Sequence, residues 1–232
     1  MLFLRCFAYK FRQKRIGMAL RILIADDHRI FRKGLRNVIS TFDNMEVVGE
    51  AINGAEALYL TDAEKPDILL LDINMPILNG IEVLEEMAKR NLSTKALMIS
   101  MHEDSMHMLK CLKAGACGYL SKDAEPAEIE KAIRQIASNG MYYNEAINNA
   151  LRNQLIQNDS TTILNSNELN DKEVTILQYM AEGLSNQDIA SKTLSSVRTV
   201  ENIRYGLMKK FGVNNGISLL IQAIKMKVVT IL

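Results

Sequence analysis

The stretch ILLLDINMP, residues 68–76, decides the fold. Its first four residues are apolar without a polar break, which is typical of a strand buried on both faces of a parallel sheet. Asp72 follows where this strand must end, and Pro76 prevents its continuation. Open α/β sheets bind their ligands at this end of the strands. Taken alone, Asp72 is a metal ligand, a nucleophile or a solvated strand end.

Short apolar runs of the same kind recur along the first half of the chain, and apolar residues at helical spacing lie between them. The runs are at residues 22–25, 47–48, 96–99 and 118–120. Pro126 suits the first turn of a last helix. Five strands that alternate with five helices over residues 20–138 predict a doubly wound, flavodoxin-like parallel sheet of the α/β class.

Polar residues follow four of these predicted strands: Asp26 and Asp27, then Asp72, Ser100 and Lys122. Because the carboxyl ends of parallel strands share one edge, we expect these side chains to converge. Clustered carboxylates need a counter-charge, and Mg²⁺ supplies one while keeping positions for phosphate oxygens. Asp72 can then accept a phosphoryl group as an acyl phosphate, with Lys122 and Ser100 contacting the phosphoryl oxygens.

The last part of the chain has a different pattern. We predict a linker over residues 139–164, which are rich in Asn. Helix-capping patterns then begin at Asn170, Ser185 and Ser196, and a further apolar stripe starts at Ile217. Four short helices, two of them joined by a tight turn, predict a separate all-α helix-turn-helix domain over residues 165–228.

Charge is distributed unevenly along the 232 residues. Residues 1–17 carry a charge of +5, and residues 160–232 carry 8 basic and 6 acidic residues. The basic balance of the last segment is a weak indication of nucleic-acid binding. Basic residues interrupt every apolar patch of residues 1–17, so this segment lacks the apolar region of a signal peptide. We predict residues 1–19 to be a disordered leader, with Met18 as an alternative start, because the ordered pattern begins just after Met18.

Cysteine content and hydropathy exclude several classes of protein. The three cysteines have no metal-ligand spacing, which favours structural thiols in a reducing compartment. No run approaches the roughly 20 apolar residues that cross a bilayer, so we expect no membrane partner.

Four motifs in the first half carry a resemblance to a known family. LIADDH, LLLDINMPILNG, ISMHED and GYLSKD resemble the receiver domain of two-component response regulators, over residues 20–138. The resemblance implies that Asp72 is the phosphoryl acceptor.

The same resemblance implies roles for the other polar residues of the edge. Ser100 is then the hydroxyl switch residue, Tyr119 the aromatic switch residue and Lys122 the phosphate-binding lysine. Mg²⁺ is held by the carboxylates and one carbonyl: Asp26, Asp27, Asp72 and the carbonyl of Asn74.

The motifs AEGLSNQDIA, RTVEN and KKFGV are similar to the LuxR-type helix-turn-helix of NarL/FixJ-family regulators. The resemblance implies that the outer arc of the third helix enters the major groove of DNA. Glu201 stands where many members carry Lys, and Ile203 where His is usual, which leaves the target sequence open. The predicted DNA contacts are Arg198, Thr199, Glu201, Asn202, Tyr205 and Lys209.

Together the two resemblances imply a cytoplasmic, phosphorylation-activated transcriptional regulator rather than an enzyme. Its expected partners are a sensor histidine kinase, promoter DNA and, after phosphorylation, a second copy of the chain. A phosphoaspartate hydrolase of the haloacid dehalogenase kind is a rival, but Asn74 stands where that chemistry needs a second acid. A receiver that works without phosphorylation is a second alternative.

Overall fold

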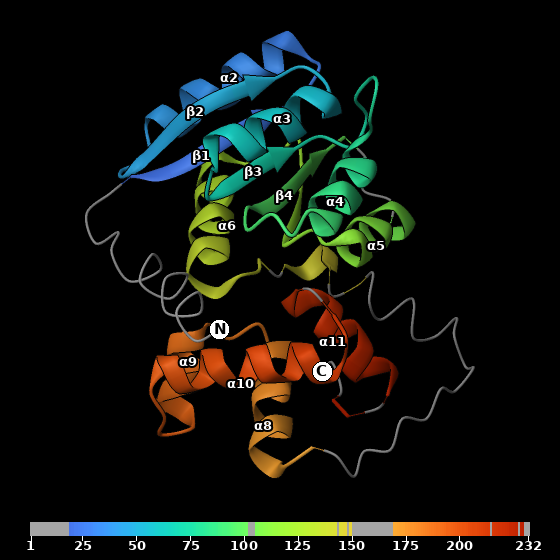
Figure 1. The fold of residues 1–232 in the computed structure, drawn as a ribbon. Helices are drawn as coiled ribbons and strands as arrows, with labels where there is room; N and C mark the ends of the chain where they lie inside the picture. Colours follow the sequence, from blue (N-terminus) through green and yellow to red (C-terminus); the bar gives the residue numbers. More distant parts are fainter. Residues whose placement is uncertain are drawn as a thin grey trace, which may run out of the picture.

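The computed structural model describes residues 19–101, 105–142, 144–147, 149, 169–213, 215–226 and 228–229. These residues form an α/β part and a separate helical part (Figure 1). The predicted leader, except for its last residue, and most of the predicted linker lie outside the described residues.

The α/β part is built on a five-stranded parallel sheet. Its strands are β1 (Leu20–Ala25), β2 (Met45–Ala51), β3 (Ile68–Leu71), β4 (Lys95–Ser100) and β5 (Gly118–Ser121), in the order β2-β1-β3-β4-β5. β3 lies in the middle and pairs with β1 and β4, and all four of its residues are buried. The predicted doubly wound sheet is confirmed, and its unbroken apolar strand is the central one.

Helices cover both faces of this sheet, because successive strand residues point to opposite sides. Ile22 and Ile24 of β1 share one apolar cluster with α2 (Arg29–Ser40) and α6 (Pro126–Asn139). Leu23 and Ala25 belong to a second cluster with the three helices of the other face, α3 (Gly54–Glu64), α4 (Gly80–Lys89) and α5 (Ser105–Ala114).

The helical part contains α8 (Asp171–Ala181), α9 (Asn186–Lys192), α10 (Val197–Lys210) and α11 (Gly216–Lys225). The predicted caps are confirmed: Asn170 and Ser185 form capping boxes, and the Ser196 side chain accepts a bond from the Thr199 amide. Gly183 follows α8 with φ 78°, the left-handed conformation that ends many helices.

The two parts touch through α5 and α11, which lie side by side in Figure 1. The Ser218 hydroxyl donates to the carbonyl of Leu112 at 3.2 Å, and the Asn215 amide lies 3.5 Å from the same oxygen. A second contact also joins the two parts: the backbone amide of Asn186 donates to the side chain of Asn139 at the end of α6. The apolar cluster on this side of the sheet continues into the core of the helical part.

Within the described residues, every helix is too short or too polar to cross a membrane.

Candidate functional site

Two strand ends bring Asp26 and Asp72 together. The Asp72 amide donates to the carbonyl of Ala25 at 2.9 Å, which ties the end of β3 to the end of β1. Backbone amides then orient the two carboxylates: His28 N–H donates to Asp26 at 2.7 Å, and Ile73 N–H donates to Asp72 at 2.8 Å. Both carboxylates are almost fully buried, while Asp27 is exposed.

These acids form a set of donors that suits a hard cation. One ligand atom from each of Asp26, Asp27, His28 and Asp72 lies within 4.8 Å of the others. Carboxylate oxygens at this spacing fit Mg²⁺, which takes few protein ligands and keeps the rest for water or phosphate. Asn74 lies on the exposed loop after β3, and the role of its carbonyl stays a prediction.

Lys122 lies between the two buried carboxylates. Its Nζ atom is 2.6 Å from Asp26 Oδ2 and 2.9 Å from Asp72 Oδ2, and its side chain is 5% exposed. Burial raises the pKa of Asp72 and outweighs the opposing effect of Lys122. Burial alone lowers the pKa of Lys122, but its bonds to the two carboxylates raise it overall. The ammonium group is therefore held as the counter-charge of the pocket.

Ser100 and Tyr119 are both buried. Ser100 ends β4, and its carbonyl accepts the Lys122 amide at 2.9 Å, so the two predicted phosphate contacts are neighbours. Tyr119 pairs in register with Met98 and belongs to the apolar cluster that holds α5 against the sheet. The structure thus places the two predicted switch residues on the strands before and after α5.

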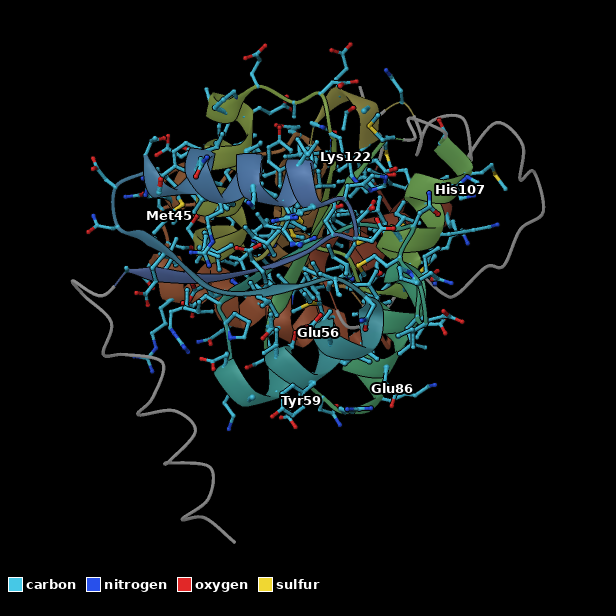
Figure 2. All side chains as sticks on the ribbon, turned by 90° about the horizontal axis from the view of Figure 1, so that it is seen from above. Met45, Glu56, Tyr59, Glu86, His107 and Lys122 are labelled. Atoms are coloured by element: carbon cyan, nitrogen blue, oxygen red, sulfur yellow. The ribbon has the colours of Figure 1, made fainter. Side chains whose placement is uncertain are left out.

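Three residues at the N-terminal end of α2 contact the acidic pair or Lys122 and are not among the predicted site residues. His28 precedes α2 as its N-cap, and its Nδ1 atom lies 2.8 Å from Asp27 Oδ1. The ring of Phe31 lies against Lys122, and Arg32 donates to the carbonyl of Asp26 at 2.7 Å. These residues could have been predicted from their position in the sequence, because a helix that begins directly after the acidic pair must border the same site. Figure 2 shows Lys122 beside α2.

The predicted DNA-binding helix, α10, presents a polar outer face. Thr199 is half-buried, and its hydroxyl lies 2.8 Å from that of Ser196. The Nζ atom of Lys209 lies 4.6 Å from the ring centre of Tyr205, so these two predicted contacts form one unit. The remaining predicted contacts, together with these two, are exposed: Arg198, Glu201, Asn202, Tyr205 and Lys209.

Arg204 is a buried cation on the inner side of the same helix. It donates to the side-chain oxygen of Asn186 at the start of α9, and burial lowers its pKa to about 10. Sequence reasoning did not single it out. The contact fixes the angle at which α9 supports α10.

Family models match both parts of the chain. Residues 22–134 match the response regulator receiver domain, and residues 167–223 match the luxR family of bacterial regulatory proteins. The nitrate/nitrite response regulator protein NarL of Escherichia coli K12 is 37% identical over 189 residues, 82% of this chain and 88% of NarL. This chain belongs to the NarL/FixJ family of response regulators.

Other members of the family extend the likeness to nearly the whole chain. The oxygen regulatory protein NreC of Staphylococcus aureus MRSA252 is 32% identical to this response regulator over 213 residues, 90% of this chain and 98% of NreC. The crystal structure of a LuxR-family response regulator from Aurantimonas sp. SI85-9A1 superposes with a TM-score of 0.56 and 32% identity. The superposition covers 60% of this chain and 99% of the Aurantimonas chain. The response regulator is therefore a DNA-binding transcription regulator with a receiver domain.

Proposed function

We propose that this response regulator is switched by transfer of a phosphoryl group from a sensor histidine kinase to Asp72, and then binds promoter DNA as a homodimer in the cytoplasm. One observation carries the proposal. Asp72 lies at the end of the central strand, in a pocket where Lys122 bridges it to Asp26. The proposed domain bounds are residues 20–138 for the receiver, 139–164 for the linker and 165–228 for the DNA-binding domain.

The chemistry assigned to this pocket is an in-line displacement. A carboxylate oxygen of Asp72 attacks phosphorus, an acyl phosphate forms, and the bond from phosphorus to the donor imidazole breaks. The imidazole nitrogen takes a proton from solvent. Lys122 keeps its ammonium group in place and turns its N–H donors from the carboxylates to the phosphoryl oxygens, with the Ser100 hydroxyl beside it. Positioning and charge neutralisation supply most of the rate enhancement in such transfers.

The acidic set fits the Mg²⁺ that the family implies, because one carboxylate oxygen from each of Asp26, Asp27 and Asp72 lies within 4.8 Å of the others and Mg²⁺ prefers oxygen ligands. Asp26, Asp27 and Asp72, with the carbonyl of Asn74, would hold the ion. When bound, Mg²⁺ neutralises charge on the phosphoryl oxygens.

Switching is proposed to act through α5. Ser100 and Tyr119 lie on the strands that lead into and follow this helix, and the Leu112 carbonyl near its end accepts the bond from Ser218 of α11. The outer face of α10 is already exposed in this arrangement, whereas α11 is packed against α5. The proposed step is therefore the release of α11, which frees the helical part to pair with a second copy.

Phosphoryl labelling tests the proposal. The protein incubated with Mg²⁺ and acetyl phosphate is expected to gain one hydroxylamine-labile phosphate and then to sediment as a dimer. Asp72→Asn should remove both effects. Asp123→Asn is the matched control, because Asp123 is an exposed acid directly after Lys122 and should leave both unchanged. Label that persists in Asp72→Asn would refute the assignment.

A further inference from the structure

Phe31 places an aromatic ring against the buried ammonium group of the pocket. The Nζ atom of Lys122 lies 4.8 Å from the centre of the Phe31 ring, within the range of a cation–π contact. The ring is half-buried on α2, one helical turn after the acidic pair. Such contacts strengthen as the cation loses water, and the Lys122 side chain is 5% exposed.

The two kinds of contact made by Lys122 differ in what would compete with them. Asp26 and Asp72 bind Lys122 in the structure, and these ion pairs would be exchanged if a metal ion and a phosphoryl group were bound there. The ring of Phe31 is neutral and carries no ligand atom, so its contact with the ammonium group can persist throughout the transfer.

The position of the ring is fixed by the first turn of α2. Arg32 donates to the carbonyl of Asp26 at 2.7 Å and to Glu50 at 3.0 Å, which ties this turn to the ends of β1 and β2. The side chain of the neighbouring Ile30 lies in solvent, because Ile30 is 89% exposed. The helix therefore presents Phe31, and not the residue before it, to Lys122.

We propose that Phe31 is a positioning residue for phosphoryl transfer, whose ring holds the Lys122 ammonium group at the phosphoryl-binding position and excludes water from it. The inference rests on the proposed function, because it assigns Phe31 an effect on the reaction at Asp72. It predicts that an aromatic ring at position 31, and not merely an apolar side chain, sets the rate of transfer.

The test compares Phe31→Leu, which keeps an apolar side chain, with Phe31→Tyr, which keeps the ring. The labelling rate with acetyl phosphate and Mg²⁺ should fall about three- to tenfold in Phe31→Leu and stay within about twofold in Phe31→Tyr. Ile30→Leu, the matched control, should label at the wild-type rate. Thermal unfolding of each variant separates a loss of folding from a loss of rate.

Two further measurements show whether Phe31 acts through Lys122. Phe31→Leu should slow labelling no further in a Lys122→Ala protein. In NMR spectra, the ring current of residue 31 should shift the Lys122 ε-methylene resonance upfield in the wild type and in Phe31→Tyr, and Phe31→Leu should abolish that shift.

The contrary outcomes distinguish a failure of the role of Phe31 from a failure of the proposed function. A wild-type rate in Phe31→Leu, an equal slowing in the Lys122→Ala background, or an unmoved resonance would overturn the role of Phe31 alone. A wild-type protein that takes no label would overturn the proposed function, and this inference with it.

Discussion

Gly80 occupies a position where a side chain has no room. A Cβ atom there would lie 2.3 Å from the carbonyl oxygen of Asp72 and 3.0 Å from the Cα atom of Ile73. The Gly80 amide also donates to the carbonyl of Ile73 at 2.8 Å, so the loop after β3 folds back directly onto the backbone beside Asp72. Gly80→Ala must push the backbone of Asp72 itself.

We therefore expect Gly80→Ala to lower the free energy of unfolding by about 1–3 kcal/mol, as overpacked sites do, and to slow labelling of Asp72. Urea denaturation and acetyl phosphate labelling measure the two effects. Gly34→Ala is the control, because Gly34 lies inside α2 with nothing within 4 Å of its Cβ position. That variant should gain about 0.5–1 kcal/mol in helix stability. Equal changes in stability and labelling rate in the two variants would contradict the claim that a side chain at position 80 displaces the backbone of Asp72.

At the scale of single residues, the sequence predicts the convergence of the pocket but not its contacts. Strand ends meet at one edge in any parallel sheet, and this places Asp26, Asp72 and Lys122 together. The contacts of Phe31 and His28 depend on how closely α2 approaches that edge and on side-chain rotamers. Neither quantity follows from the order of residue types.

Among the helices, α10 carries the proposed DNA contacts, and its two exposed halves should behave differently. Asn202 lies in the first half, whose end usually enters the groove, whereas Lys209 lies two turns later and stacks on Tyr205. Asn202→Ala should cost about 1–3 kcal/mol on the preferred site and little on random DNA. Lys209→Ala should weaken both and lower the salt slope by about one.

Affinities for specific and random duplexes over a salt series distinguish these results. The Tyr205 ring restricts the orientation of the Lys209 side chain. Tyr205→Leu should therefore reproduce part of the loss of affinity for random DNA that Lys209→Ala causes. A selective loss on the preferred site in Lys209→Ala, with a uniform loss in Asn202→Ala, would mean that α10 docks on DNA in another orientation.

The existence and type of the elements were predictable, and their extents less so. Capping residues are local signals, which is why the starts of α8, α9 and α10 follow from the sequence. The second strand runs over Met45–Ala51, longer than its apolar pair at 47–48, because backbone pairing with β1 continues past the apolar residues. Arg204 is buried because α9 offers Asn186 as a partner, and helical periodicity alone does not predict such a partner.

The contact between the two parts of the molecule lies beyond what patterns in the sequence indicate. The predicted apolar stripe that starts at Ile217 lies on α11, and in the structure it is buried within one chain. Helical periodicity shows that a face is covered, but a core, another domain and a second copy all satisfy the same pattern. The dimer interface therefore stays a prediction.

The arrangement of the whole molecule can be shifted in either direction by single substitutions at this contact. The Ser218 hydroxyl bonds to Leu112 of α5, while its amide separately donates to the Asn215 cap at 2.7 Å. Ser218→Ala therefore removes a contact between the parts and leaves the helix cap intact. Loss of one such bond costs about 1 kcal/mol. This corresponds to about a fivefold rise in the population of the open form, in which α11 is released from α5.

Lys113 offers the opposite change. Burial lowers its pKa, and Lys225 across the contact lowers it further, so two like charges face each other where α5 meets α11. Lys113→Glu replaces this repulsion with attraction and should favour the closed arrangement. Without phosphorylation, sedimentation should then show more dimer for Ser218→Ala than for the wild type, and less for Lys113→Glu.

If release of α11 permits pairing, as proposed, DNA affinity should follow the same order as dimerisation. Ser191→Ala is the matched control, since that hydroxyl bonds to Gln187 within α9 and takes no part in the contact. Phosphorylation should reduce the difference in dimer fraction between Ser218→Ala and the wild type. If phosphorylation itself releases α11, the substitution can add little to the population in which α11 is already free. A Ser218→Ala protein that dimerises no more than Ser191→Ala would mean that the contact between α5 and α11 does not restrain pairing. Release of α11 would then be excluded as the step that phosphorylation controls.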